Sequence, residues 1–372
     1  MPYYANLQHT VPEADRKRAI GNLLALREQL KASVPDKDLD NTLLLATWNL
    51  RDFGKKNRRG FGDRLAETHF YIAEVISRFD LVAIQEINAL PEWSLVMAIL
   101  GHEWDYIATD VTDTKLGGNG ERLTFVFDKR KVAFKNIAGE IVLPDDMLIS
   151  KAELEVEAGK IVAGKQFRRT PFVVSFQSGW LKFDICTVHL YFGADSGAKL
   201  VQRIEEIDRI ARYFGGRAEA ALEEKKALIL LGDFNIVSPE HRTMQALLDA
   251  GFTVPSVLRD KPSNTRKTKH YDQIAFKTKR DMLSFIEREA DDPRQRNAGI
   301  FDIFAAIFTP SQFTLYSAAA KATDNGSILN GEALKNYYLD WRTYQFSDHM
   351  PMWVRIEVND SDSYLMKWHQ DL

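Results

Sequence analysis

Four apolar stretches of this sequence adjoin side chains that could hold a metal ion or transfer a proton. They pair residues 43–48 with Asn49, 81–84 with Gln85 and Glu86, 227–231 with Asp233 and Asn235, and 352–358 with Asp348 and His349. Oxygen ligands of this kind suit a hard divalent cation, and a histidine beside them suits a general base. Hydrolysis of a phosphodiester needs both, because charge on the phosphoryl oxygens must be neutralised while protons move to and from the reacting oxygens.

Glu86 is the leading candidate metal ligand. A carboxylate that follows an apolar stretch is costly to hold unless a cation or a hydrogen-bond donor satisfies it. Asn49 either orients Glu86 or reaches the metal through water. Asp348 and His349 are adjacent and point in different directions, so Asp348 would ligate or orient the metal while His349 meets the phosphate. Each residue alone also fits an ordinary strand end or turn, so the combination carries the prediction.

Asp233 and Asn235 form a second candidate group. One residue separates them, so on an extended segment both side chains point to the same face. They could grip one phosphate and its attacking water together. An ordinary Asp-Asn turn after a strand is the alternative interpretation.

Strands and helices alternate in mixed order around these residues. Besides the four apolar stretches, we expect strands at 123–127, 172–176, 183–190 and 271–276, and amphipathic helices at 63–79, 198–214 and 239–250. Segments 113–120, 144–166 and 277–345 lack these patterns and are interpreted as loops. The mixture predicts an α/β protein with two sheets and helices outside them.

The candidate ligands extend from Asn49 to His349, so we expect one catalytic domain over residues 41–360. Residues 1–40 are interpreted as a helical appendage that packs against this domain. A capping box of Thr10 and Glu13 would start its helix. Residues 361–372 are interpreted as a C-terminal tail.

Charge and composition say little about partners. The formal net charge is -3, from 49 basic and 52 acidic residues, so an anionic substrate must be held by local charges. The single cysteine, Cys186, excludes an internal disulfide. We find no export signal and no apolar run of membrane-spanning length. These features favour a cytoplasmic protein with no membrane partner and no obligate protein partner.

Eight short motifs occur in an order that resembles one protein family. They are residues 48–54 (WNLRDFG), 84–86 (IQE), 120–123 (GERL), 169–171 (RTP), 188–190 (VHL), 232–235 (GDFN), 271–274 (YDQI) and 347–351 (SDHMP). Together they are similar to the endonuclease/exonuclease/phosphatase superfamily, with the nearest pattern in its DNase I branch. The resemblance implies a four-layered α/β sandwich, in which helices flank two central mixed sheets and the active site lies at one edge. It also implies a phosphoesterase that uses Mg²⁺, with Mn²⁺ as an alternative.

The resemblance also assigns roles to the candidate residues. Asn49 and Glu86 fall on metal-site positions. Asp233 falls where the family orients the nucleophile or a metal, and Asn235 falls where it stabilises the phosphoryl oxygens. Arg51 matches a position near the substrate backbone, as does the arginine of the fourth motif, Arg169. Just after Arg51, a basic cluster could track a nucleic-acid backbone; it consists of Lys55, Lys56, Arg58 and Arg59.

Two histidine-carboxylate pairs follow from the same resemblance, His349 with Asp272 and His189 with Glu121. A carboxylate fixes the tautomer of an imidazole and raises its basicity, so one histidine could accept a proton while the other donates one. We assign His349 as the general base and His189 as the general acid, and the sequence leaves the reverse order open.

These expectations favour a divalent-metal-dependent phosphodiesterase, namely a DNA endonuclease that uses histidine-assisted attack by water. The alternatives are a phosphatase or lipid phosphodiesterase of the same fold, of the inositol-phosphate phosphatase or sphingomyelinase type, and a non-catalytic binding protein. The DNase I pattern probes the minor groove with an arginine and a tyrosine where this chain has Asn88 and Asn119. That departure argues against minor-groove insertion.

Overall fold

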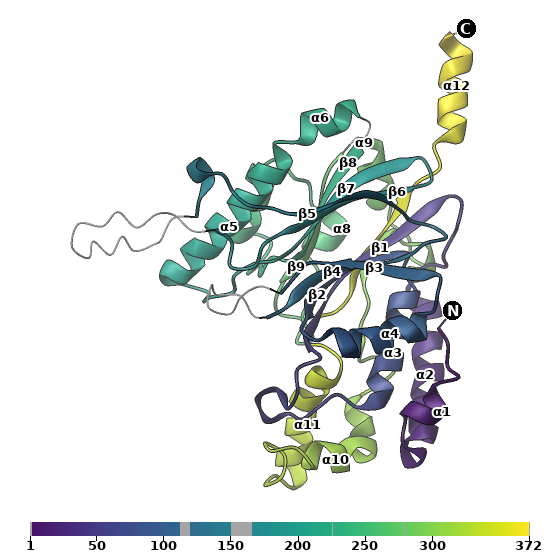
Figure 1. Cartoon of the computed structure of the whole chain (residues 1–372), viewed down its shortest axis with the longest axis vertical. Coiled ribbons are helices and arrows are strands. Elements are labelled where there is room, and N and C mark those ends of the chain that lie inside the picture. Colours follow the sequence, from purple (N-terminus) through teal and green to yellow (C-terminus); the bar gives the residue numbers. More distant parts are fainter. Residues whose placement is uncertain (1, 112–119, 150–165, 225, 279, 372) are drawn as a thin grey trace, which may run out of the picture.

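The computed structural model describes residues 2–111, 120–149, 166–224, 226–278 and 280–371. Its strands form two mixed sheets (Figure 1). The first has the order β10 (Ala298–Ile300), β11 (Met352–Glu357), β1 (Thr42–Phe53), β2 (Leu81–Ile87), β4 (Arg122–Asp128) and β3 (Trp104–Ala108). The second has the order β5 (Ala133–Glu140), β6 (Phe172–Ser178), β7 (Leu181–His189), β8 (Lys226–Asp233) and β9 (Asp272–Lys277).

Helices cover the outer faces of both sheets, and the chain ends in a helix that extends away from them (Figure 1). The helices are α1 (Leu7–Thr10), α2 (Glu13–Ser33), α3 (Ala66–Ser77), α4 (Leu90–Leu100), α5 (Gly197–Gly215), α6 (Ala218–Glu223), α7 (Arg242–Asp249), α8 (Ser256–Arg259), α9 (Arg280–Ile286), α10 (Phe313–Lys321), α11 (Gly331–Gln345) and α12 (Ser361–Asp371).

Alternation along the strands builds the layers. On β1, Leu43 and Leu45 lie in the core between the two sheets, whereas Leu44 and Ala46 lie in a core shared with α2, α3, α4 and α11. The outer face of the second sheet packs against α5 and α7 in a third core. Because successive side chains of a strand point to opposite faces, one apolar strand serves two cores. The predicted four-layered α/β sandwich is confirmed.

Strand direction brings the candidate site residues to one edge of the sandwich. β1 runs parallel to β2 and β7 runs parallel to β8, so the carboxyl ends of each pair lie together. β11 is antiparallel to β1 and β9 is antiparallel to β8, so their first residues come to the same edge. At that edge His189 pairs with Asp233, and Asp233 pairs with Asp272.

Two irregularities turn side chains into this edge. The β1–β2 register shifts between Asn49 and Phe53, and the β2–β4 register shifts between Ile84 and Ile87. Glu86 has φ +67°, and Arg51 has φ +45°. Bulges of this kind re-aim side chains, and left-handed backbone at residues other than glycine is concentrated at functional sites. Sequence periodicity gave no sign of either bulge.

A glycine before Asp233 permits close packing of β8 on β7. Gly232 has φ +129°, and a Cβ there would lie 2.2 Å from the carbonyl oxygen of Val188. Any side chain would therefore push β8 away from the strand that carries His189.

The region 277–345 was expected to be a loop, and that expectation is wrong. It contains α9, β10, α10 and α11. Tyr338 and Trp341 of α11 are buried against the first sheet's outer core, because the aromatic residues recur at helical spacing. Of the other expected loops, residues 112–119 and 150–165 lie outside the described residues, as does Asn119.

The N-terminal segment packs on the domain as expected, with α2 against α3. The expected capping box is wrong. Pro12 is the N-cap residue of α2, and the Thr10 hydroxyl donates instead to the carbonyl of Asn6 within α1. Proline has no amide hydrogen and a fixed φ, so it can precede the first helical turn without a side-chain cap. The domain boundaries remain predictions. No helix among the described residues combines the length and hydrophobicity needed to cross a bilayer.

Candidate active site

A cleft of about 580 Å³ opens at this edge of the sandwich. Eight of the candidate residues line it, namely Arg51, Glu86, Arg169, His189, Asp233, Asn235, Asp348 and His349. The other three candidates, Asn49, Glu121 and Asp272, lie directly behind and contact residues that line the cleft. The structure therefore brings all eleven candidate residues to one place.

His189, at the end of β7, is held by a buried carboxylate. Its Nδ1 lies 2.6 Å from Glu121 Oε1, and Arg169 Nε lies 2.8 Å from the same oxygen. Arg169 also donates from Nη1 to the carbonyls of His189 and Leu190, each at 3.3 Å. Arg169 thus fixes both the carboxylate and the backbone of the histidine.

His349 has an equivalent partner from the second sheet. Its Nδ1 lies 2.8 Å from Asp272 Oδ2, and Asp272 is fully buried. The backbone around His349 is tied to β1, because Trp48 Nε1 donates to the His349 carbonyl at 3.0 Å and Ser347 Oγ donates to the Asn49 carbonyl at 2.6 Å. These bonds set the imidazole of a late segment against a strand near the start of the chain.

Asp233 lies between the two histidines. Its Oδ2 is 3.6 Å from His189 Nε2 and 3.7 Å from His349 Nε2, and it accepts a hydrogen bond from Asn49 Nδ2 at 3.1 Å. Each imidazole therefore bonds its own buried carboxylate, Glu121 or Asp272, through Nδ1. Both imidazoles present Nε2 to Asp233. Both Nε2 atoms are placed to exchange protons with a group bound there.

Glu86 shares an amide with Asp233. Asn49 Nδ2 donates to Glu86 Oε1 at 3.0 Å, while the amide oxygen of Asn49 accepts from the Arg51 amide at 2.8 Å. Glu86 Oε1 also lies 3.8 Å from His189 Nε2. Two nearly buried carboxylates joined by one amide form an oxygen-rich, negatively charged set. This donor chemistry fits a hard divalent cation such as Mg²⁺.

Asp348 and Arg51 form part of the cleft wall and pair with each other, with Arg51 Nη1 3.3 Å from Asp348 Oδ2. The Arg51 guanidinium stacks over the ring of Tyr344, 3.7 Å from its centroid. Tyr344 belongs to α11, so the region expected to be a loop supplies this wall. Stacking on a buried ring holds the guanidinium plane in a fixed orientation.

Burial and neighbouring charge set the protonation of these groups. Burial lowers the pKa of His349, but the carboxylates of Asp272 and Asp233 outweigh it and raise that pKa well above its usual value. Burial and Arg169 lower the pKa of His189, yet Glu121 and Asp233 produce a net rise. Burial raises the pKa of Glu86, and the positive charge of His189 opposes that shift. A carboxylate cluster that is costly to ionise would be relieved by a bound cation.

Asn235 reaches the cleft by a route that was not expected. It lies after the end of β8 with φ +55°, so the expected extended geometry shared with Asp233 is wrong. Its amide nitrogen donates to Asp233 Oδ1 at 3.0 Å, and its side-chain Nδ2 donates to the Leu190 carbonyl at 2.9 Å. The turn, the alternative interpretation, is what the chain forms.

The basic cluster that follows Arg51 is largely neutralised. Arg58 is buried and donates to the carbonyls of Arg51 and Tyr344. Lys55 pairs with Asp52, and Lys56 lies 3.0 Å from Glu92. Arg59 is exposed at the cleft. The prediction that Arg58 tracks a nucleic-acid backbone is therefore wrong, because its charge is directed into the fold.

No site role was predicted from the sequence for Tyr271 and Phe192, which line the cleft, or for Arg203 behind Phe192. Tyr271 packs its ring 5.4 Å from that of His349, and Phe192 packs 6.1 Å from Tyr271. Arg203 of α5 lies behind Phe192 and is fully buried. Tyr271 directly precedes Asp272, which was the available signal. No pattern linked Phe192 and Arg203 with the site. Phe192 lies in the loop after β7, and Arg203 lies in α5, well beyond the strand end that carries His189.

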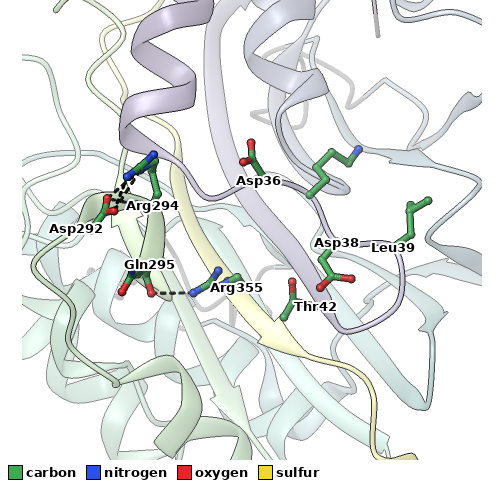
Figure 2. Close-up of a pocket in the computed structure, with 9 residues that line it drawn as sticks. Asp36, Asp38, Leu39, Thr42, Asp292, Arg294, Gln295 and Arg355 are labelled. Carbon is green, nitrogen blue, oxygen red and sulfur yellow. Dashed lines mark hydrogen bonds and ion pairs between the residues drawn. The ribbon is translucent and has the colours of Figure 1, made fainter.

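A second hollow, of about 730 Å³, lies near the opposite end of β1, where Thr42 is the first residue of the strand (Figure 2). Several of its charged groups pair with side chains outside the hollow, such as Asp36 with Arg78 and Lys37 with Asp80. Arg294 pairs with Asp292, and Arg355 donates to the Gln295 carbonyl at 2.7 Å (Figure 2). Arg294 and Asp292 thus neutralise each other, and Arg355 is bound by a carbonyl.

Comparison with known proteins adds a relative and several similar structures. No protein-family model matches the chain. A deoxyribonuclease of Thioalkalivibrio sp. (strain K90mix) is 27% identical over 205 residues, which cover 54% of this chain and 47% of that protein. The match thus spans about half the length of this curated relative.

Solved structures similar to the chain include an endonuclease/exonuclease/phosphatase family protein from Bacteroides thetaiotaomicron, at 16% identity and a TM-score of 0.48, covering 86% of this chain and 95% of that chain. D. rerio TDP2 complexed with a single strand DNA product is similar at 12% identity and a TM-score of 0.47, covering 85% of this chain and 99% of that chain. The similar structures therefore include members of the family that the motifs resemble. The fold itself is established by its two mixed sheets and flanking helices.

Proposed function

We infer that this chain is a divalent-metal-dependent phosphodiesterase that hydrolyses DNA as an endonuclease. One observation carries the proposal: Asp233 faces the Nε2 atoms of His189 and His349, and each histidine is held from behind by a buried carboxylate. Two proton carriers around one carboxylate match the need of hydrolysis for one group that accepts a proton and one that donates a proton. The deoxyribonuclease relative supports DNA as the substrate.

His349 is the proposed base. The ring acts in its neutral form, with its Nδ1 proton directed to Asp272 and a lone pair at Nε2 that takes a proton from the attacking water. Because Asp272 and Asp233 raise the pKa of His349, this form requires positive charge bound in the cleft that offsets those carboxylates. Asp233 orients that water, and Asn235 with Arg51 faces the phosphoryl oxygens. His189, protonated at both nitrogens beside Glu121, gives its Nε2 proton to the leaving oxygen.

Glu86 and Asp348 are the residues proposed to ligate the metal, and Asn49, whose Nδ2 donates to Glu86, is proposed to orient that carboxylate. The ion, Mg²⁺ or Mn²⁺, would neutralise charge on the phosphoryl group when bound. The structure favours Glu86 over Asp348 as the principal ligand, because Asp348 is already paired with Arg51. Arg169, proposed from the sequence to bind substrate, contacts Glu121 through Nε and is proposed to position the His189 pair as well.

The test is cleavage of supercoiled plasmid by metal-stripped protein, with Mg²⁺ or Mn²⁺ restored. We expect nicked circles only after the metal is restored, and little nicking by Glu86→Gln under the same conditions. A parallel panel of single-stranded DNA, RNA, inositol phosphates and sphingomyelin distinguishes the nuclease from the phosphatase and lipid phosphodiesterase. Cleavage that persists in EDTA would contradict the metal dependence.

A further inference from the structure

A row of aromatic rings leads from the candidate base to the rim of the cleft. The His349 and Tyr271 rings have centroids 5.4 Å apart at an interplanar angle of 32°, and Tyr271 meets Phe192 edge-on at 6.1 Å and 85°. Phe192 lines the cleft and keeps 44% of its surface exposed. By contrast, Tyr344, which also lines the cleft, is buried beneath Arg51.

Two buried charged residues of α5 hold the loop that carries Phe192. Arg203 donates from Nε to the Phe192 carbonyl at 2.8 Å and from Nη2 to the Ala194 carbonyl at 2.8 Å. Glu206 Oε2 accepts from the Tyr191 amide at 2.9 Å. Arg203 and Glu206 are both fully buried. Burying two charges is costly, so their bonds to this loop are a strong constraint on its shape.

The same arginine connects the loop to the candidate catalytic residues. Arg203 Nη1 donates to the Asn235 carbonyl at 2.9 Å, and the guanidinium lies 4.8 Å from the centre of the Phe192 ring. One face of the ring is thus supported by a cation, while exposed ring surface is left towards the cleft. A large apolar side chain held in place at the edge of a polar cleft is suited to a flat ligand.

We propose that Phe192 is a stacking platform for an unpaired nucleobase next to the scissile phosphate, so that the site prefers single-stranded nucleic acid to duplex. The proposal rests on the proposed phosphodiesterase function and specifies its substrate class. In a duplex both faces of each base are covered by its neighbours, and exposing a face costs a few kcal/mol. An unpaired base offers its face to the ring without that cost, and stacking of this kind tolerates any base.

The expected effect of removing the ring follows from the strength of stacking. A base on an aromatic side chain contributes about 1–3 kcal/mol, which corresponds to about 5- to 150-fold in kcat/KM. Phe192→Ala should lower kcat/KM for a single-stranded oligonucleotide by that factor relative to the value for an oligonucleotide of stable abasic residues, which has no ring to stack. Phe192→Trp should retain the preference, and Phe192→Leu should lose most of it, because an aliphatic side chain has no π face.

The experiment compares wild type and these variants, with Mg²⁺, on the single strand, the same strand annealed to its complement, and an oligonucleotide of stable abasic residues. Trp180→Ala is the matched control, because Trp180 is 53% exposed and lies at the opposite end of β7 from His189. We expect a single-strand preference in wild type that Phe192→Ala reduces and Trp180→Ala preserves.

The outcomes separate this proposal from the one on which it rests. If the duplex is cleaved at least as well as the single strand, or if Phe192→Ala slows all three substrates equally, the stacking role is wrong while the phosphodiesterase stands. If Phe192→Ala impairs hydrolysis of sphingomyelin vesicles instead, the platform serves a lipid and the proposal is wrong. If wild type hydrolyses none of these substrates, both proposals fail.

Discussion

The acid and base assignments can be separated by the leaving group. Replacing His189 by alanine removes the Nε2 proton proposed for the leaving oxygen, and replacing His349 by alanine removes the acceptor for the proton of water. Each change should lower kcat on DNA by about 10²- to 10⁴-fold, equivalent to about 2.7–5.4 kcal/mol in the activation barrier. On DNA alone the two variants would therefore look alike.

A p-nitrophenolate leaving group departs without protonation at neutral pH, so it should relieve the need for an acid. On bis(p-nitrophenyl) phosphate we expect His189→Ala to recover most of its loss, while His349→Ala stays impaired. Glu121→Gln should follow His189→Ala, because Glu121 lies 2.6 Å from His189 Nδ1 and is almost completely buried. The double variant should then be about as slow on DNA as His189→Ala alone, because a group that acts through the imidazole has no effect without it.

The assay is kcat and KM for both substrates at saturating Mg²⁺, with circular dichroism melting curves to show that each variant is folded. Recovery by His349→Ala in place of His189→Ala would reverse the assignment. Independent, multiplicative losses from Glu121→Gln and His189→Ala would refute the idea that the carboxylate acts through the histidine.

Three further predictions concern stability and binding. Burial lowers the pKa of His69 from 6.5 to about 4, so the unfolded chain gains a proton first as pH falls; stability should drop by up to about 3 kcal/mol between pH 6.5 and 4, and urea titrations should show that His69→Gln flattens this slope. Replacing Asp128, which is fully buried beside Lys37, by asparagine should lower the free energy of unfolding by about 1–3 kcal/mol. Replacing the exposed Asp36 by asparagine should lower it by less than about 1 kcal/mol in the same denaturation assay. Arg59→Ala should reduce the salt dependence of DNA binding by about one unit of slope in fluorescence anisotropy, and an unchanged slope would remove Arg59 from the binding surface.

The sequence predicted which residues gather at one edge of the sandwich, because strand patterning and strand ends are local signals. Apolar runs placed Asn49, Glu86, Asp233 and His349 at strand ends, and a sheet brings such ends together. The pairing of His189 with Glu121 was predicted from the resemblance alone. His189 ends β7 of one sheet and Glu121 directly precedes β4 of the other, so no local pattern connects them. Their contact depends on how the sheets pack, which periodicity does not encode.

The failures also have physical causes. Arg58 was expected to face a nucleic-acid backbone. Its guanidinium instead donates to two carbonyls inside the fold and so supplies the hydrogen bonds that buried carbonyls need. Asn235 took a left-handed turn because its amide nitrogen caps Asp233 Oδ1. The helices of region 277–345 were hidden by the turn residues between them, such as Asn325 and Gly326. In each case the structure depends on hydrogen bonds or packing contacts that the local sequence pattern does not reveal.

Anomalous diffraction from crystals soaked in MnCl₂ tests most directly whether distant segments converge on one catalytic cation. We expect a manganese peak in the cleft at coordination distance from the Glu86 carboxylate, and we expect this peak to disappear in Glu86→Gln. No peak at Glu86, or a peak only in the second hollow beside Asp36 and Asp38, would contradict it.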